Sequence, residues 1–346
     1  MKPLFEVTER DRAFYENRLR AFLPPRLIDV HTHVWLADFI SKEGSDARGA
    51  TWPSLVARDN SAEDLIASYG LFFPDKQVKA LLFGYPLRSC DLSSNNRYVA
   101  QCAQKYHMPA LMVAVPETGA SELEKELDEG GFIGAKVYLD FAPPHIPSEN
   151  ICIYDFLPKE QLALLNERGA VVMLHIPRPA RLKDPLNLQQ MMEIEQTYPN
   201  IRLIIAHVGR AYCPEDVGNA FEVLSRSERM MFDFSANTNK IVFTELIKAV
   251  GPKRILFGSD LPITRMRMKR VCENGSYTNI VPKGLYGDVS NEAHMGEAEG
   301  EDAESLTFFM YEEVDAFRRA AEKTGLSKED VEDIFYLNAV RTLGLE

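Results

Sequence analysis

Short apolar runs rich in β-branched residues alternate with longer amphipathic stretches along nearly the whole chain. Strands that are apolar throughout and alternate with helices are typical of a parallel sheet covered by helices on its faces. Eight such units are what a closed barrel requires, so the pattern predicts an α/β fold, a (β/α)8 TIM barrel. The alternative, an open doubly wound sheet, lacks the glycine-rich phosphate loop expected after its first strand. The eight predicted strands are Leu27–His33, Val78–Tyr85, Ala110–Val115, Ile133–Leu139, Ala170–Ile176, Leu203–Val208, Met230–Phe234 and Arg254–Gly258.

The length of 346 residues fits one catalytic domain spanning 1–346, because α/β barrels often exceed 250 residues as single domains. Three segments fall outside the repeat. Residues 1–24 predict an N-terminal helical extension, capped by Thr8 and Asp11, that covers the bottom of the barrel. Residues 34–76 after the first strand and 261–303 after the last predict two long loop insertions over the active-site face. Either could act as a lid or complete the pocket in a homodimer.

Charge and composition exclude several classes of partner. The net charge of -12 disfavours nucleic acid, since a polyanion is bound by a basic surface. No run approaches the roughly 18 apolar residues of a membrane helix, and the charged N-terminus resembles no signal peptide. The five cysteines are scattered and odd in number, as expected for reduced thiols in a cytoplasmic protein.

Histidine and aspartate side chains stand where several predicted strands end. His31 and His33 are two residues apart in the first strand, so both imidazoles can point to one face. His175, His207 and Asp260 follow the fifth, sixth and eighth strands. A barrel gathers these carboxyl ends around one cavity, and neutral imidazoles with a carboxylate suit zinc, manganese or iron. The remaining histidines, His107, His145 and His294, are interpreted as surface or structural residues.

Basic residues near the same strand ends predict the substrate. Lys136 lies inside the apolar fourth strand, where a charge is costly unless it is paired or functional. We interpret it first as a substrate clamp; a carboxylated bridging ligand and half of a salt bridge are the alternatives. Arg178, Arg210 and Arg265 each follow a predicted ligand by three to five residues. Guanidinium groups pair with carboxylates, so the cluster predicts a small anionic, carboxylated substrate.

The motifs together resemble the amidohydrolase superfamily, in its branch of TIM-barrel hydrolases, lactonases and decarboxylases. The resemblance spans residues 27 to 345 in the family's order, and it includes Tyr138 next to the substrate clamp. It implies that His31, His33, His175 and Asp260 hold one or two divalent ions, most simply zinc, and that His207 is the catalytic acid/base or a further ligand. The motifs are HTH at 31–33, GAKVY at 134–138, MLHIPR at 173–178, AHVGR at 206–210, LFGSDLP at 256–262 and LNAVRTLGL at 337–345.

Three functional hypotheses follow. The first is a metal-dependent hydrolase of a lactone, ester or amide, in which Asp260 accepts a proton from an activated water and His207 protonates the leaving group. The second is a non-oxidative decarboxylase or hydratase that uses the same ligands. The third, of another class, is a non-catalytic barrel that binds a small anion, and the intact His and Asp set argues against it.

Overall fold

The predicted strands form a ring of parallel strands in the computed structural model, which describes residues 4–41 and 55–345. Every predicted run overlaps a strand, although the later strands are shorter than predicted. Their bounds are β1 (Arg26–His33), β2 (Gln77–Phe83), β3 (Met112–Val113), β4 (Gly134–Val137), β5 (Val171–Leu174), β6 (Arg202–Ile205), β7 (Met231–Asp233) and β8 (Ile255–Leu256).

Backbone hydrogen bonds close this ring into a barrel. β1 pairs in parallel with β2, and β3 to β8 pair in parallel in sequence order. The two groups meet at both edges. Leu111 N donates to Leu82 O at 2.8 Å, and Val30 N donates to Phe257 O at 3.0 Å. The (β/α)8 prediction is therefore confirmed.

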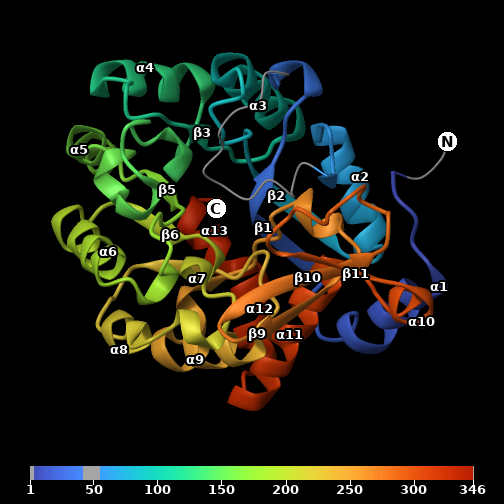
Figure 1. The fold of residues 1–346 in the computed structure, drawn as a ribbon. Coiled ribbons are helices and arrows are strands. Elements are labelled where there is room, and N and C mark those ends of the chain that lie inside the picture. Colours follow the sequence, from blue (N-terminus) through green and yellow to red (C-terminus); the bar gives the residue numbers. More distant parts are fainter. Residues whose placement is uncertain (1–3, 42–54, 346) are drawn as a thin grey trace.

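Helices surround the strands, as Figure 1 shows for α3, α4, α5, α6, α8 and α9. The first of them, α2, lies inside the segment 34–76 that the sequence suggested to be a loop, and the mutual cap of Ser61 and Asp64 begins it. Residues 42–54 of that segment lie outside the described residues. Among the described residues, no helix combines the length and the apolar character needed to cross a membrane. The helices around the barrel are α2 (Ala62–Phe72), α3 (Leu92–Tyr106), α4 (Ala120–Gly130), α5 (Lys159–Glu167), α6 (Pro185–Thr197), α8 (Ala220–Leu224), α9 (Lys240–Val250) and α11 (Phe309–Thr324).

The C-terminal helices, and not residues 1–24, close the bottom of the barrel. α12 (Lys328–Glu332), a π-turn over Asp333–Leu337 and α13 (Asn338–Leu343) run on from one another. Ala339 and Leu343 pack with the strand side chains of the barrel interior, such as Ile28, Met173 and Leu256. By contrast, α1 (Glu9–Phe14) and the turn after it pack on the outside against α11, with the rings of Tyr15 and Tyr311 6.0 Å apart. The predicted Thr8 and Asp11 cap is present.

The segment 261–303 after β8 is an ordered small sheet. β10 (Ser276–Pro282) lies between β9 (Lys269–Glu273), its antiparallel neighbour, and β11 (Met295–Ala298), which is parallel to it. A short helix, α10 (Gly300–Glu304), follows. The alternating burial of β10 predicts one covered face, and its Val281 packs with Met266, Met268 and Phe309 in a separate hydrophobic cluster. The insertion sheet, drawn in orange in Figure 1, is thus fixed to the start of α11.

Gly134 shows how closely the strands pack beneath the site. A Cβ at this position would overlap the backbone carbonyl of Val171 in β5. We expect Gly134→Ala to lower the free energy of unfolding by about 2–3 kcal/mol, because the two strands must move apart. Urea unfolding measures this. The control is Gly70→Ala in α2, which meets no atom within 4 Å and should gain up to about 1 kcal/mol. Equal stability of the two variants would contradict the expectation.

Candidate active site

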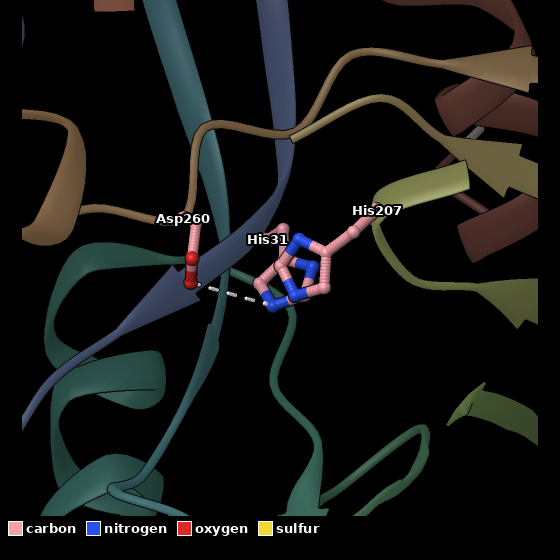
Figure 2. Close-up of side chains that lie close together, drawn as sticks. All are labelled: His31, His207 and Asp260. Carbon is pink, nitrogen blue, oxygen red and sulfur yellow. Dashed lines mark ion pairs between the residues drawn. The ribbon is translucent and has the colours of Figure 1, made fainter. Parts of the chain in front are cut away.

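Three of the predicted site residues meet at the carboxyl ends of β1, β6 and β8. One donor atom each from His31, His207 and Asp260 lies within 4.8 Å of the other two. Figure 2 shows the two imidazoles side by side, with the Asp260 carboxylate facing His31 across 3.6 Å from Nε2 to Oδ1. His33 joins from the same strand as His31, with its Nε2 3.2 Å from Asp260 Oδ1.

His175 lies at the edge of this group. Its ring centroid is 5.3 Å from that of His207 and 4.5 Å from that of Tyr138. Its buried Nδ1 has no hydrogen-bond partner among the described residues. The predicted ligand set of His31, His33, His175 and Asp260 is thus only partly the same as the tightest group in the structure, which contains His207 instead of His33 and His175.

Hydrogen bonds on the far side of three imidazoles set their orientation. His31 Nδ1 donates to Asp233 Oδ2 at 3.0 Å, and His33 Nδ1 donates to Gly84 O at the same distance. His207 Nδ1 donates to Ser235 O at 3.1 Å. Because these oxygens accept, the Nε2 lone pair of each ring is left for a ligand.

Asp233 at the end of β7 is a residue that the sequence reasoning missed. Besides His31, it accepts from the backbone N of His207 at 2.9 Å, so one carboxylate orients two site histidines. The available signal was a lone acidic residue inside the apolar run Met230–Phe234.

The charge states suit a divalent metal. Burial lowers the pKa of His31 well below its usual value, aided by the nearby Lys136, and burial also lowers that of His207. Burial raises the pKa of Asp260, but its contact with His33 and its closeness to His207 and His31 outweigh burial and hold the pKa at about 2. Neutral imidazoles beside an ionised carboxylate are the donor set that zinc, manganese and iron bind, so the residues present fit the predicted metal.

Strained backbone is concentrated around the site. His207, Arg210 and Asp260 have φ angles of 56°, 61° and 63°, in the left-handed region that side chains other than glycine avoid. Val208 is there too, at 50°, although it is β-branched. Such conformations persist where the surroundings enforce them, and they gather at functional sites.

A cavity of about 360 Å³ opens above these residues. Of the side chains predicted to bind substrate, Lys136, Tyr138 and Arg210 line it. Buried Lys136 has its Nζ 3.3 Å from His31 Nε2, and burial lowers its pKa to about 8. It forms no ion pair with a carboxylate in the described part of the chain, so the salt-bridge interpretation finds no partner.

Arg178 and Arg265 require a correction. Within the described residues, neither lines the cavity. Arg178 Nε donates to Asp184 Oδ2 at 3.0 Å, which turns the guanidinium to the start of α6. Arg265 Nε donates to Ser68 Oγ at 3.0 Å, so this arginine fixes the loop after β8 to α2.

Other cavity residues were not identified from the sequence. The insertion supplies Arg270 from β9, Tyr277 from β10 and His294 from the loop before β11, so His294, interpreted as a surface or structural residue away from the site, in fact lines the cavity. The loops after β5 and β6 supply Arg181 and Tyr212, each close in sequence to a predicted ligand. The signal was the same proximity that selected Arg178, but it does not determine which arginine turns inward.

A TIM barrel that gathers histidines and an aspartate at its strand ends, around one cavity, is typical of metal-dependent enzymes. The chain belongs to the amidohydrolase family, described as "Amidohydrolase", whose sequence model matches residues 28–345. No curated protein matches the chain significantly.

Three solved structures of this fold are similar to the chain. A probable 2-pyrone-4,6-dicarboxylic acid hydrolase from Acinetobacter baumannii, with citric acid bound, shares 17% identity at a TM-score of 0.56, covering 92% of this chain and 99% of that one. An amidohydrolase from Burkholderia multivorans with bound zinc shares 14% identity at a TM-score of 0.57, covering 92% of this chain and 99% of that one. A dihydroxybenzoic acid decarboxylase from Polaromonas, with manganese and the inhibitor 2-nitroresorcinol, shares 14% at 0.53, covering 93% and 98%.

Proposed function

We propose that this protein is a metal-dependent hydrolase that opens a lactone, ester or amide bond in a small carboxylated compound. The observation that carries the proposal is the convergence of imidazole Nε2 atoms on the Asp260 carboxylate at the floor of a cavity. Since the Nδ1 atoms of His31, His33 and His207 are engaged elsewhere, these Nε2 atoms are preorganised donors.

His31, His33, His175 and Asp260 would hold the ion. Zinc is the first choice, with manganese or iron as the alternatives, and the site would take one or two ions; the related structures contain zinc in one case and manganese in another. A divalent ion bound here supplies a water molecule of lowered pKa and polarises the carbonyl of the substrate.

The chain's own residues then move the protons. Asp260, ionised and next to two imidazoles, accepts the proton of the attacking water. His207 lies within reach of the same atoms without having to hold the ion; its unprotonated Nε2 takes the proton that Asp260 accepted from the water and passes it to the leaving oxygen or nitrogen. Its hydrogen bond to Ser235 O keeps the ring in one orientation throughout.

The cations of the cavity would position the substrate. Among the described residues, Arg210 donates only through Nη1, to the carbonyls of Ile176, Pro177 and Arg178, so its other nitrogens are available to a carboxylate. Lys136 in β4 adds a charge, and Tyr138, which follows that strand, adds a ring and a hydroxyl. The Acinetobacter relative, whose structure contains citric acid, accommodates an anion in the same fold.

An assay of zinc-loaded protein tests the proposal. The probes are 2-pyrone-4,6-dicarboxylate, whose ring opening is followed by absorbance, and 2,6-dihydroxybenzoate, whose carbon dioxide release is measured. Metal-dependent ring opening supports the hydrolase. Carbon dioxide release alone would replace it with the decarboxylase, and metal-free protein that binds both probes without turnover would favour the anion-binding barrel.

Replacing Arg210 by methionine is expected to raise KM by about 10- to 150-fold, the cost of roughly 1.5–3 kcal/mol for a lost hydrogen bond to a charged group. The kcat should change much less, because Arg210 contacts the substrate away from the bond that breaks. Steady-state kinetics with the substrate found above measure both. Arg97→Met, on the exposed face of α3, is the control. An unchanged KM in Arg210→Met would contradict the assignment.

A further inference from the structure

Arg270 of the insertion sheet presents its guanidinium group to the cavity, and no carboxylate of the described residues pairs with it. It is packed among aromatic rings, with its Cζ 4.9 Å from the ring centre of Tyr212, 4.4 Å from Tyr277 and 4.6 Å from Phe309. Nε donates to Asn279 Oδ1 at 2.8 Å and Nη1 to Ala236 O at 2.6 Å. Within residues 4–41 and 55–345, no carboxylate forms an ion pair with it, and Nη2 has no hydrogen-bond acceptor.

Two arginines near Arg270 each form an ion pair with a carboxylate. Arg181, whose Cζ lies 5.3 Å from the same Tyr212 ring, pairs with Asp216 at 2.7 Å. Arg267, three residues before Arg270, pairs with Asp11 at 2.6 Å. Removing a charged group from water without a counter-ion costs free energy, and contacts with aromatic rings compensate only part of that cost for the Arg270 guanidinium. An anion that enters the cavity would supply the missing charge.

Two hydrogen-bond acceptors hold the Arg270 guanidinium in place, and one of them is itself held by α11. The backbone N of Ala236 donates to Glu313 Oε2 of α11 at 2.6 Å, and Ala236 adopts φ 48°. The carbonyl that accepts from Arg270 Nη1 is therefore held by a second element. Asn279 of β10 holds Nε. Because two bonds orient the planar group, Nη2 is preorganised and little side-chain entropy is lost when it binds.

Arg210 is the second cavity arginine without a carboxylate partner among the described residues. Both guanidinium groups lie near Tyr212. Burial raises the pKa of that phenol to about 12, and the charges of Arg210 and Arg270 oppose the rise. The cavity therefore offers acidic groups two arginines from different elements, Arg210 on the loop after β6 and Arg270 on the insertion sheet.

We propose that Arg270 determines specificity by binding a second carboxylate, so that the preferred substrate is a small dicarboxylate. One acidic group contacts Arg210 and the other contacts Arg270. This proposal rests on the proposed function in one respect: the hydrolysis determines which end of the substrate lies at the metal site and reacts. The insertion sheet is then the part of the chain that selects dianions over monoanions.

Binding of two non-reacting probes tests this. Benzene-1,3-dicarboxylate and benzoate are titrated into zinc-loaded protein by calorimetry. We expect the dicarboxylate to bind at least about 10-fold more tightly, and Arg270→Met to weaken it by about 10- to 100-fold while benzoate changes less than about 2-fold. Lys269→Met is the matched control, since Lys269 is exposed, adjacent in β9 and on its other face, and it should keep the preference.

Other results would overturn the proposal. They are a wild-type protein without preference, a preference that Arg270→Met retains, or an equal loss of both probes in Arg270→Met and in the milder Arg270→Gln, as a purely structural role predicts. Because the readout is binding, it is separate from the test of hydrolysis. A protein that prefers the dicarboxylate but opens no ring retains the subsite and loses the proposed reaction.

Discussion

Replacing Asp260 by asparagine should remove the bound metal and lower kcat by at least about 10³-fold. Residues that only orient a ligand typically change metal affinity or activity by roughly 10- to 100-fold, and a direct ligand that also accepts the proton should cost more. The amide is nearly the same size, so the fold should persist, but it carries no charge and cannot accept a proton at neutral pH. Elemental analysis and steady-state kinetics measure the two losses.

The matched control is Asp302→Asn in α10, an exposed carboxylate at the end of the insertion that follows Asp260. It should keep both metal and activity. A variant Asp260→Asn that retains stoichiometric metal and more than about a tenth of the wild-type kcat would refute the role assigned to Asp260, since neither its ligand function nor its proton function would then be needed.

Asparagine substitutions of His207 and His175 should separate acid/base chemistry from metal binding. We expect His207→Asn to keep its metal and lose about 10²- to 10⁴-fold in kcat, the range for a positioned acid/base. His175→Asn should lose the metal. The prediction is a demanding one, because His207 lies nearer to His31 and Asp260 than His175 does.

Elemental analysis of both purified proteins, after reloading with zinc and gel filtration, gives the answer. If His207→Asn is the variant without metal, His207 is a ligand and the leaving group must receive its proton from another group. If both variants keep the metal, then His31, His33 and Asp260 suffice to hold it, and His175 would have another role.

The sequence predicted the barrel because its signals are local and repeated. Each apolar run identifies a strand, and the order of eight such runs leaves one closed arrangement, so the strand ends that bear His31, His207 and Asp260 had to converge. Helix caps such as Thr8 with Asp11 depend on residues three apart, and they too could be read directly.

The missed features depend on contacts between distant residues. Asp233 matters because it accepts a hydrogen bond from His31, which lies 202 positions away in the sequence. Arg270 matters because no carboxylate of the described chain lies beside it. No local pattern records either fact. Arg178 and Arg181 differ by three positions, yet Asp184 holds the first outside the cavity, while a left-handed backbone with φ 61° turns the second inward. Loop conformation decides such cases.

The packing of α13 has a consequence for partly folded forms of the protein. Ile28, Met173 and Leu256 are covered at one end of the barrel by Ala339 and Leu343. In any intermediate whose strands have paired before α13 docks, these side chains are exposed to water. Such an intermediate carries an apolar surface that favours aggregation or recognition by chaperones, so the docking of α13 is the step that removes this risk.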